Sequence, residues 1–299
     1  MMSDKPLVSV IIIFFNSEFF LKEAIESVFS QLYEHWELFL VDDGSTDAST
    51  ETALTYARTH PDKVHYLEHE GHQNCGMSAT RNLGIRHAKG KYIALLDSDD
   101  IWFPDKLKQQ VAIMEAQPSA SMVYGPSQKW YSWTGNPEDA ERDSYYHLGI
   151  DGNTLVQPPK LITLCLQGKA ITPCPSNILF RSKIIKKIGG FEEDWRGMYQ
   201  LYEDQVFLSK VFLHEPVYIS DYSWDKYRKH QSSCVAQAKQ LGQEEIVRLA
   251  YLNWLESYLK TQNLQEPNIV RLIRKEKILC GSQLGNKLPN VVKRLIRSL

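Results

Sequence analysis

The feature that most constrains the fold is a continuous apolar run at Leu7–Phe15, which reads LVSVIIIFF. Its β-branched and aromatic residues show no regular alternation with polar ones, a pattern typical of a strand that is buried on both faces. Strands of this kind belong to parallel sheets whose two faces are covered by helices. The run therefore predicts an α/β protein built around a buried sheet.

The next eighty residues repeat the same strand-then-helix pattern. Further strands are predicted at Glu37–Val41, Val64–Leu67 and Tyr92–Leu96. Apolar residues at helical spacing predict helices in the intervening segments, at about 21–32, 46–60 and 76–88. This alternation predicts a doubly wound, mostly parallel, Rossmann-like central sheet.

The pattern is less regular after the fourth strand. A strand is predicted at Met122–Gly125 with a hairpin partner at Gln128–Gly135, followed by a long loop over Pro137–Pro159. Then come a strand at Ile178–Arg181 and a helix at Glu203–Leu213. From about residue 240 the chain reads as helices, so we expect a domain over 1–235 and a helical extension over 236–299.

Charge and cysteine content narrow the class of protein. The formal net charge of -2 gives no general attraction to nucleic acid. The five cysteines are scattered and none has CxxC spacing, which predicts a reducing, cytoplasmic setting without a zinc site. The longest apolar run is too short to cross a bilayer, which takes about 20 residues. Any contact with a membrane is therefore expected to be peripheral.

Acidic residues follow two of the predicted strands. One cluster is Asp42-Asp43-Gly44-Ser45, and the other is Asp97-Ser98-Asp99-Asp100. Ligands of doubly wound sheets bind in the crevice beyond the carboxyl ends of the strands, where both clusters should lie. The segment Phe14-Phe15-Asn16 ends the first strand and should lie at the same edge.

The cluster at Asp97–Asp100 is a candidate metal site. Carboxylates held this close repel one another unless a cation lies between them, and oxygen ligands suit Mg²⁺ or Mn²⁺. The alternative is a solvated turn that caps the next helix. Position at the end of a central strand favours the metal site.

Two other residues are candidates for ligand binding. In the segment after the second strand, Ser45 or Thr46 can cap the next helix and Asp47 suits its first turn. Asp43 then has no structural task, so we expect it to accept hydrogen bonds from a base or ribose. Arg81 lies on the helix before the acidic strand and could contact a phosphate, although alone it reads as a surface arginine.

Four blocks in order resemble the inverting family 2 glycosyltransferases of the GT-A fold. They are the first strand with Phe15-Asn16, then DDGSTD, then ATRNLGI, then GKYIALLDSDD, and a looser match continues through Gly189–Glu193 and Tyr202–Asp204. The family pattern often has Tyr-Asn after the first strand. Because Phe15 lacks the hydroxyl group, contacts of this segment to a base are expected from its backbone.

The resemblance implies a donor site for a nucleotide sugar, expected to be a UDP-sugar, in the 1–125 half of the domain. Asp43 would recognise the base with Arg81 assisting, and Asp97 would hold the ribose or a metal-bound water. Asp99 would bind the metal, and His230 in the block Tyr227–His230 could complete the metal shell. The complete nucleotide-sugar site implied is Phe14, Phe15, Asn16, Asp43, Arg81, Asp97 and Ser98.

The resemblance also implies a catalytic base and an acceptor side. Asp204 would take the proton of the acceptor hydroxyl as the new bond forms. The alternative for Glu203-Asp204 is a pair of ordinary acids in the first turn of a helix. Residues 126–235 would form the acceptor half. The acceptor would be a glycan, a lipid-linked molecule or a protein.

The end of the chain is strongly basic, since Asn268–Leu299 contains eight Lys or Arg residues and one Glu. Within it, Asn290–Leu299 places apolar residues on one face, as an interfacial amphipathic helix does. Such a helix would bring the protein to the inner face of the membrane. The alternative is that the helix packs on the domain or on a second subunit of a homodimer.

Two other functions remain to be weighed against glycosyl transfer. A metal-dependent nucleotidyltransferase would usually show a Gly-rich, cationic phosphate loop after the first strand, and Phe14–Ser17 has none. A non-catalytic scaffold would be expected to have lost acids at Asp97–Asp100 or at Asp204, and all are present.

Overall fold

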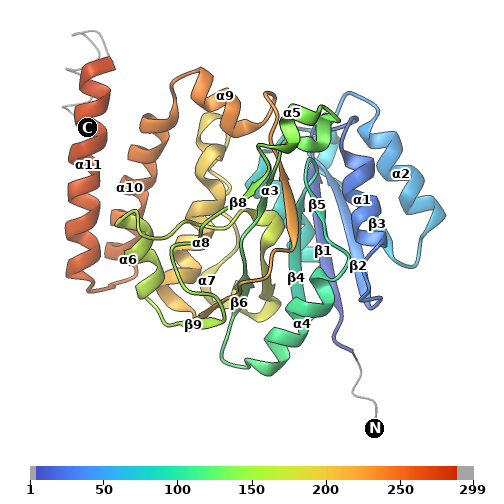
Figure 1. The fold of residues 1–299 in the computed structure, drawn as a ribbon, viewed down its shortest axis with the longest axis horizontal. Coiled ribbons are helices and arrows are strands. Elements are labelled where there is room, and N and C mark those ends of the chain that lie inside the picture. The colour runs from blue at the N-terminus through green and yellow to red at the C-terminus, as the bar shows by residue number, and fades with distance from the viewer. Residues whose placement is uncertain (1–4, 288–299) are drawn as a thin grey trace.

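The computed structural model describes residues 5–287 of the chain, and in Figure 1 they form a central sheet with helices on both sides. The predicted parallel half is confirmed: its strands are β1 (Val8–Phe14), β2 (Trp36–Asp42), β3 (Val64–Glu68) and β4 (Tyr92–Asp97). They pair in the order β3-β2-β1-β4, all parallel. The connecting helices are α1 (Leu21–Phe29), α2 (Ser49–Thr59) and α3 (Met77–His87).

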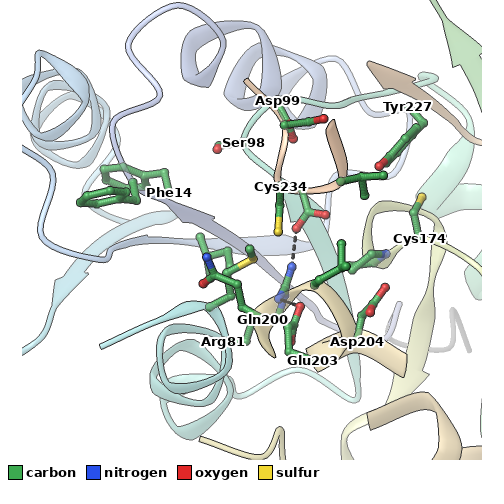
Figure 2. Close-up of a pocket in the computed structure, with 18 of the residues that line it drawn as sticks. Phe14, Arg81, Ser98, Asp99, Cys174, Gln200, Glu203, Asp204, Tyr227 and Cys234 are labelled. Carbon is green, nitrogen blue, oxygen red and sulfur yellow. Dashed lines mark hydrogen bonds and ion pairs between the residues drawn. The ribbon is translucent and has the colours of Figure 1, made fainter. Parts of the chain in front are cut away.

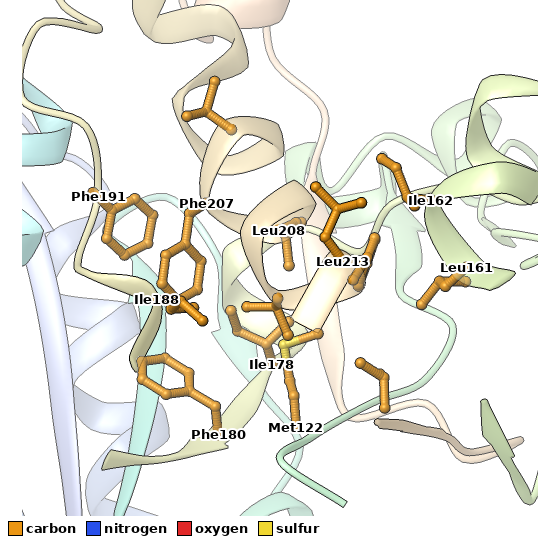
Figure 3. Packing of buried hydrophobic residues seen from close by; sticks show 14 of the residues in the cluster. Met122, Leu161, Ile162, Ile178, Phe180, Ile188, Phe191, Phe207, Leu208 and Leu213 are labelled. Carbon is orange, nitrogen blue, oxygen red and sulfur yellow. The ribbon is translucent and has the colours of Figure 1, made fainter. Parts of the chain in front are cut away.

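The apolar run at the start of the chain lies at the centre of this sheet, and every residue of β1 and β2 is buried. Alternate residues feed two different cores because successive side chains of a strand point to opposite faces. Ile11 and Ile13 join the cluster on one face, and Val10 and Ile12 join the cluster on the other. Figure 3 shows part of the first cluster, where Phe191 stacks on Phe207 with ring centroids 4.2 Å apart.

The remaining strands of the main sheet are short and of mixed direction. They are β6 (Met122–Tyr124), β9 (Thr154–Val156), β10 (Leu179–Arg181) and β11 (Val217–Ile219). The strand β10 lies between β4 and β6 and is antiparallel to both. The predicted strand at Met122–Gly125 therefore exists, but it pairs with β10 and β11.

A second sheet of four strands lies beside the first. Its order is β5-β12-β7-β8, with bounds Ile101–Trp102, Asp225–Arg228, Gln128–Trp130 and Ser144–Tyr145. The predicted hairpin of Gln128–Gly135 with the preceding strand is wrong, because β7 pairs with β12 and β8. The expected loop at 137–159 is also wrong, since it contains α5 (Pro137–Ala140), β8 and β9. Strands of two or three residues are too short to show a periodic pattern.

Helices cover both faces of the main sheet and extend beyond it. They are α4 (Lys106–Ala116), α6 (Lys160–Leu166), α7 (Ile185–Ile188), α8 (Glu203–His214), α9 (Cys234–Gln240), α10 (Glu244–Thr261) and α11 (Pro267–Lys287). The predicted C-terminal helices are thus confirmed as α10 and α11, which pack on each other at one end of the molecule in Figure 1. Val247 of α10 and Ile269 of α11 belong to the same buried cluster as Ile11 of β1.

The predicted amphipathic helix at Asn290–Leu299 lies outside the described residues, so its membrane and subunit alternatives stay predictions. Within residues 5–287, no helix combines the length and the apolar character needed to cross a membrane.

Candidate active site

The residues singled out from the sequence line one cleft of about 990 Å³. It opens at the carboxyl ends of β1, β2 and β4, where the doubly wound sheet was expected to bind its ligand. The start of α8 and the residues after β12 form the other walls, and Figure 2 shows part of the lining. The predicted residues that line the cleft are Phe14, Phe15, Asn16, Asp43, Arg81, Asp97, Ser98, Asp99, Asp204 and His230.

The segment after β1 is tied to the turn after β2. Asn16 adopts a left-handed backbone with φ of 49°, and its Oδ1 accepts a hydrogen bond from Thr46 N at 2.7 Å. The Asn16 amide donates to Ser45 Oγ at 3.1 Å. Phe15 is left half exposed at the edge of the cleft, while Phe14 is buried. This wall therefore offers a flat aromatic ring and a fixed backbone to a ligand.

Asp43 does have a structural task, so the expectation that it has none is wrong. The expected cap at Ser45 or Thr46 is wrong too, because α2 begins at Ser49 and Ala48 is the residue at its cap. Its carboxylate accepts hydrogen bonds from the amides of Cys75 and Gly76 and from Thr80 Oγ1, at 2.7 to 3.1 Å. These donors hold the start of α3 against the end of β2. Burial raises the pKa of Asp43 even though the donors and His69 lower it. A base-binding role for Asp43 stays a prediction.

Arg81 is not a surface arginine, since its side chain is only 2% exposed. Its Nη2 atom donates to Asp97 Oδ1 at 2.5 Å, and its Nη1 atom donates to Glu203 Oε1. Both contacts are marked by dashed lines in Figure 2. Burial raises the pKa of Asp97 and of Glu203, and the guanidinium opposes this rise in both. Arg81 thus fastens the end of β4 to the start of α8, a link that the sequence did not predict.

Asp204 lies beside this ion-pair network, in the first turn of α8. Its Oδ1 atom accepts a hydrogen bond from the Gln205 amide at 2.7 Å, and Asp204 forms no ion pair with any side chain described in 5–282. Burial raises the pKa of Asp204 to about 6, against the lowering effect of Arg81. A carboxylate with this pKa is a better proton acceptor near neutral pH than an ordinary aspartate.

Asp99 and His230 meet across the cleft, although 131 residues separate them. Asp99 Oδ2 lies 2.8 Å from His230 Nε2, and His230 Nδ1 lies 2.7 Å from Ser232 Oγ. A carboxylate oxygen and an imidazole nitrogen at one point form a donor set that fits a divalent ion. The residues present therefore fit the predicted metal, and the assignment of Asp99 and His230 as its ligands stays a prediction.

A deeper group, Asp100, Cys174 and Asp225, also has side chains that could hold a metal ion. Each of them already has partners in the protein. Asp100 accepts hydrogen bonds from Ser176 Oγ at 2.6 Å and from the Arg228 amide at 2.9 Å. The Cys174 thiol donates to Asp225 Oδ2 at 3.3 Å. Asp100 therefore joins the acidic turn to β12, which is the role that the sequence left open.

Arg228 is a residue of the site that the sequence did not single out. It is buried, and its Nε atom donates to the Asp99 carbonyl oxygen at 2.6 Å. Its guanidinium lies 4.3 Å from the centre of the Trp130 ring and 4.7 Å from that of Phe20. Arg228 lies on β12 and its hydrogen bond joins that strand to the backbone of the acidic turn. His230 follows two residues later and therefore lies next to Asp99.

Comparison with known proteins agrees with the family resemblance seen in the sequence. Residues 9–189 match the model of glycosyl transferase family 2. The putative glycosyltransferase EpsE of Bacillus subtilis is 42% identical over 114 residues, which are 38% of this chain and 40% of EpsE. The putative teichuronic acid biosynthesis glycosyltransferase TuaG of the same organism is 38% identical over 125 residues, 41% of this chain and 48% of TuaG. The chain thus matches less than half the length of each relative.

Solved structures agree on the fold. The crystal structure of S. aureus TarS 1-349 superimposes with a TM-score of 0.65 at 18% identity, covering 94% of this chain and 73% of TarS 1-349. The mannosyltransferase PcManGT of Pyrobaculum calidifontis gives a TM-score of 0.58 at 16% identity, covering 99% of this chain and 80% of PcManGT. At these identities the likeness shows the shared GT-A fold and nothing finer.

Proposed function

Because the chain belongs to glycosyl transferase family 2 and is a glycosyltransferase, we propose that it transfers a sugar from a UDP-sugar to an acceptor hydroxyl with inversion at the anomeric carbon. The observation that carries this proposal is the single cleft in which the strand-end acids, the Asp99–His230 pair and Asp204 face a common space. The nucleotidyltransferase and scaffold alternatives lose their support with the family assignment.

The donor would lie against the carboxyl ends of β1, β2 and β4. Phe15 offers a ring face to the base, and Asp43 offers a carboxylate that is already held in place by α3. Related folds support a nucleotide-sugar donor, since TarS has been solved with UDP and with UDP-GlcNAc and PcManGT with GDP-Man and Mn²⁺. Asp97 is held by Arg81, so its orientation toward the ribose would be set before the donor arrives.

Asp99 and His230 would hold Mn²⁺ or Mg²⁺. The bound ion supplies neutralisation of the charge that develops on the departing diphosphate. The chain's own part is to orient the two ligands, since Ser232 lies within hydrogen-bond distance of the second ring nitrogen of His230. Arg228 holds the Asp99 backbone from the other side.

Asp204 would act as the base that accepts the proton of the acceptor hydroxyl. The raised pKa of about 6 keeps most of this carboxyl group ionised at pH 7 and makes it a stronger proton acceptor than an ordinary aspartate. The Gln205 amide fixes one carboxylate oxygen. Acceptors would be hydroxyl groups of a glycan or another glycoconjugate, in cell-surface polysaccharide synthesis, and TuaG is named for a role of this kind.

The test is a screen of UDP- and GDP-sugars for nucleotide release, with Mn²⁺ or Mg²⁺ present. The Asp204→Asn variant should bind UDP as the wild type does and lose about 10²–10⁴-fold in turnover, the usual contribution of a general base. The matched control is Asp194→Asn, an exposed residue outside the cleft, which should keep full turnover. Wild-type turnover by Asp204→Asn would refute the base assignment, and no turnover of any nucleotide sugar would refute the proposal.

A further inference from the structure

The end of the cleft opposite Phe14 includes a residue of the second sheet, Tyr227 of β12. In Figure 2, Phe14 lies at one side of the cleft, and Tyr227 and Cys174 lie at the other. Tyr146, just after β8, also lines this end. If the donor binds beside β1 as proposed, this end is left for the acceptor, and its side chains decide what the acceptor can be.

Two lysines that are not themselves part of the lining contact the tyrosines at this end. Lys129 on β7 is paired with Tyr227 on β12, so the two side chains lie on the same face of the second sheet. Lys229 is two residues beyond Tyr227 and shares that face. Its Nζ atom lies 4.1 Å from the centre of the Tyr227 ring and donates to Tyr146 Oη at 2.8 Å. Lys129 Nζ lies 4.5 Å from the centre of the Tyr146 ring.

Neither cation has an anion to pair with among residues 5–287. Lys129 and Lys229 are partly buried, and no carboxylate lies within ion-pair distance of either. Asp100, which attracts Lys229 from farther away, is already hydrogen-bonded to Ser176 and Arg228. Two partly buried lysines that contact the same tyrosine without an ion-pair partner in 5–287 raise the positive potential at this end of the cleft, which favours an anion there.

We propose that Lys129 and Lys229 bind an anionic group of the acceptor, a carboxylate or a phosphate, next to the hydroxyl that receives the sugar. The inference rests on the proposed function and names its acceptor class as an anionic glycan or polyol chain. The ring faces of Tyr146 and Tyr227 would pack on the acceptor backbone, and the two ammonium groups would pair with its charge.

The experiment measures binding of acceptor analogues that differ only in charge, with the full chain saturated with UDP and Mn²⁺. Trigalacturonic acid is compared with its methyl ester, and a glycerol phosphate trimer is compared with neutral triglycerol. Titration calorimetry should show binding of an anionic compound at least about tenfold tighter than that of its neutral partner, weakening as salt is raised. The pair of compounds with the larger difference in affinity indicates whether the site prefers a carboxylate or a phosphate.

The test variant is Lys129→Met with Lys229→Met, which keeps an unbranched side chain of nearly the same length at both positions and removes the charge. The matched control is Lys226→Met, because Lys226 lies on β12 next to Tyr227 on the opposite face, over the ring of Trp130 at 5.1 Å. The double variant should lose the preference for the anionic compound and still bind UDP, and the control should keep both.

An equal affinity for charged and neutral compounds, no binding of either anionic compound, or unchanged anion binding by the double variant would each overturn this inference. The proposed function is tested apart from it by nucleotide-sugar hydrolysis without acceptor. If hydrolysis occurs and the charge preference does not, the acceptor class alone is wrong.

Discussion

Arg81→Met should strongly destabilise the protein, whatever substrate it uses. Methionine fills similar space without a charge, so the change removes the one cation that contacts both Asp97 and Glu203. Removing one partner from a buried ion pair leaves the other charge unpaired and costs about 3–5 kcal/mol. Arg81 serves two carboxylates, of which Glu203 is 3% and Asp97 25% exposed. We therefore expect a loss near the upper end of that range.

Urea unfolding followed by tryptophan fluorescence measures this loss. With a slope of about 3 kcal/mol/M, the high end for small proteins, the midpoint should fall by about 1–1.7 M. Burial raises the pKa of both carboxyl groups, so without Arg81 they take up protons more readily in the folded state. The stability lost should therefore be smaller at pH 5 than at pH 8.

The matched control is Arg86→Met on the same helix. Arg86 and its partner Glu193 are both more than half exposed and 3.5 Å apart, so the loss should not exceed about 1 kcal/mol. Adding Glu203→Gln to Arg81→Met should restore part of the stability, because it removes a charge that was left unpaired. A loss below about 1 kcal/mol in Arg81→Met would refute the reasoning.

Three further predictions follow from the same contacts. Turnover should rise about tenfold from pH 5 to pH 7, as Asp204, the proposed base with a pKa of about 6, loses its proton; a flat profile in that window would exclude Asp204 as the base. His230→Ala should raise the Mn²⁺ concentration needed for half-maximal turnover by at least about tenfold. The control His87→Ala, at an exposed position, should not change it. Equal metal titrations for both variants would show that His230 is not a metal ligand. Gly44→Ala should destabilise by about 1–3 kcal/mol, because φ is +82° and a Cβ would lie 2.8 Å from the His72 carbonyl oxygen; Gly135→Ala, with φ of +75° and open space around it, should cost less in the same urea assay.

The fold of the first hundred residues could be predicted because its signals are local. The strands β1, β2 and β4 are six or seven residues long, and nearly all of their residues are buried. Both the strand conformation and the burial of an apolar run of that length can be predicted from its sequence. The carboxyl ends of parallel strands meet at one edge, so the acids after β2 and β4 had to lie near each other.

The second half was harder because its elements are short and their partners are distant. The strand β7 has three residues, and its neighbour β12 begins nearly a hundred residues later. No spacing rule links such segments, so a hairpin with the nearest strand was expected instead. The family resemblance predicted that His230 and Asp204 belong to the site. It did not predict the contacts that hold them in place.

By itself, the sequence determined the α/β sheet, the edge at which the cleft opens and the kinds of side chain that line it. Only the tertiary structure decided what each of those side chains does. Asp43 supports α3, Arg81 links β4 to α8, and Asp100 binds β12 to the acidic turn. Secondary structure and burial leave a periodic pattern within a short segment, whereas a side chain's partners depend on which distant segments pack against it. The packing of distant segments also brings Lys129 and Lys229 together without a counter-ion among the described residues. They lie beside the end of the cleft that we propose for the acceptor.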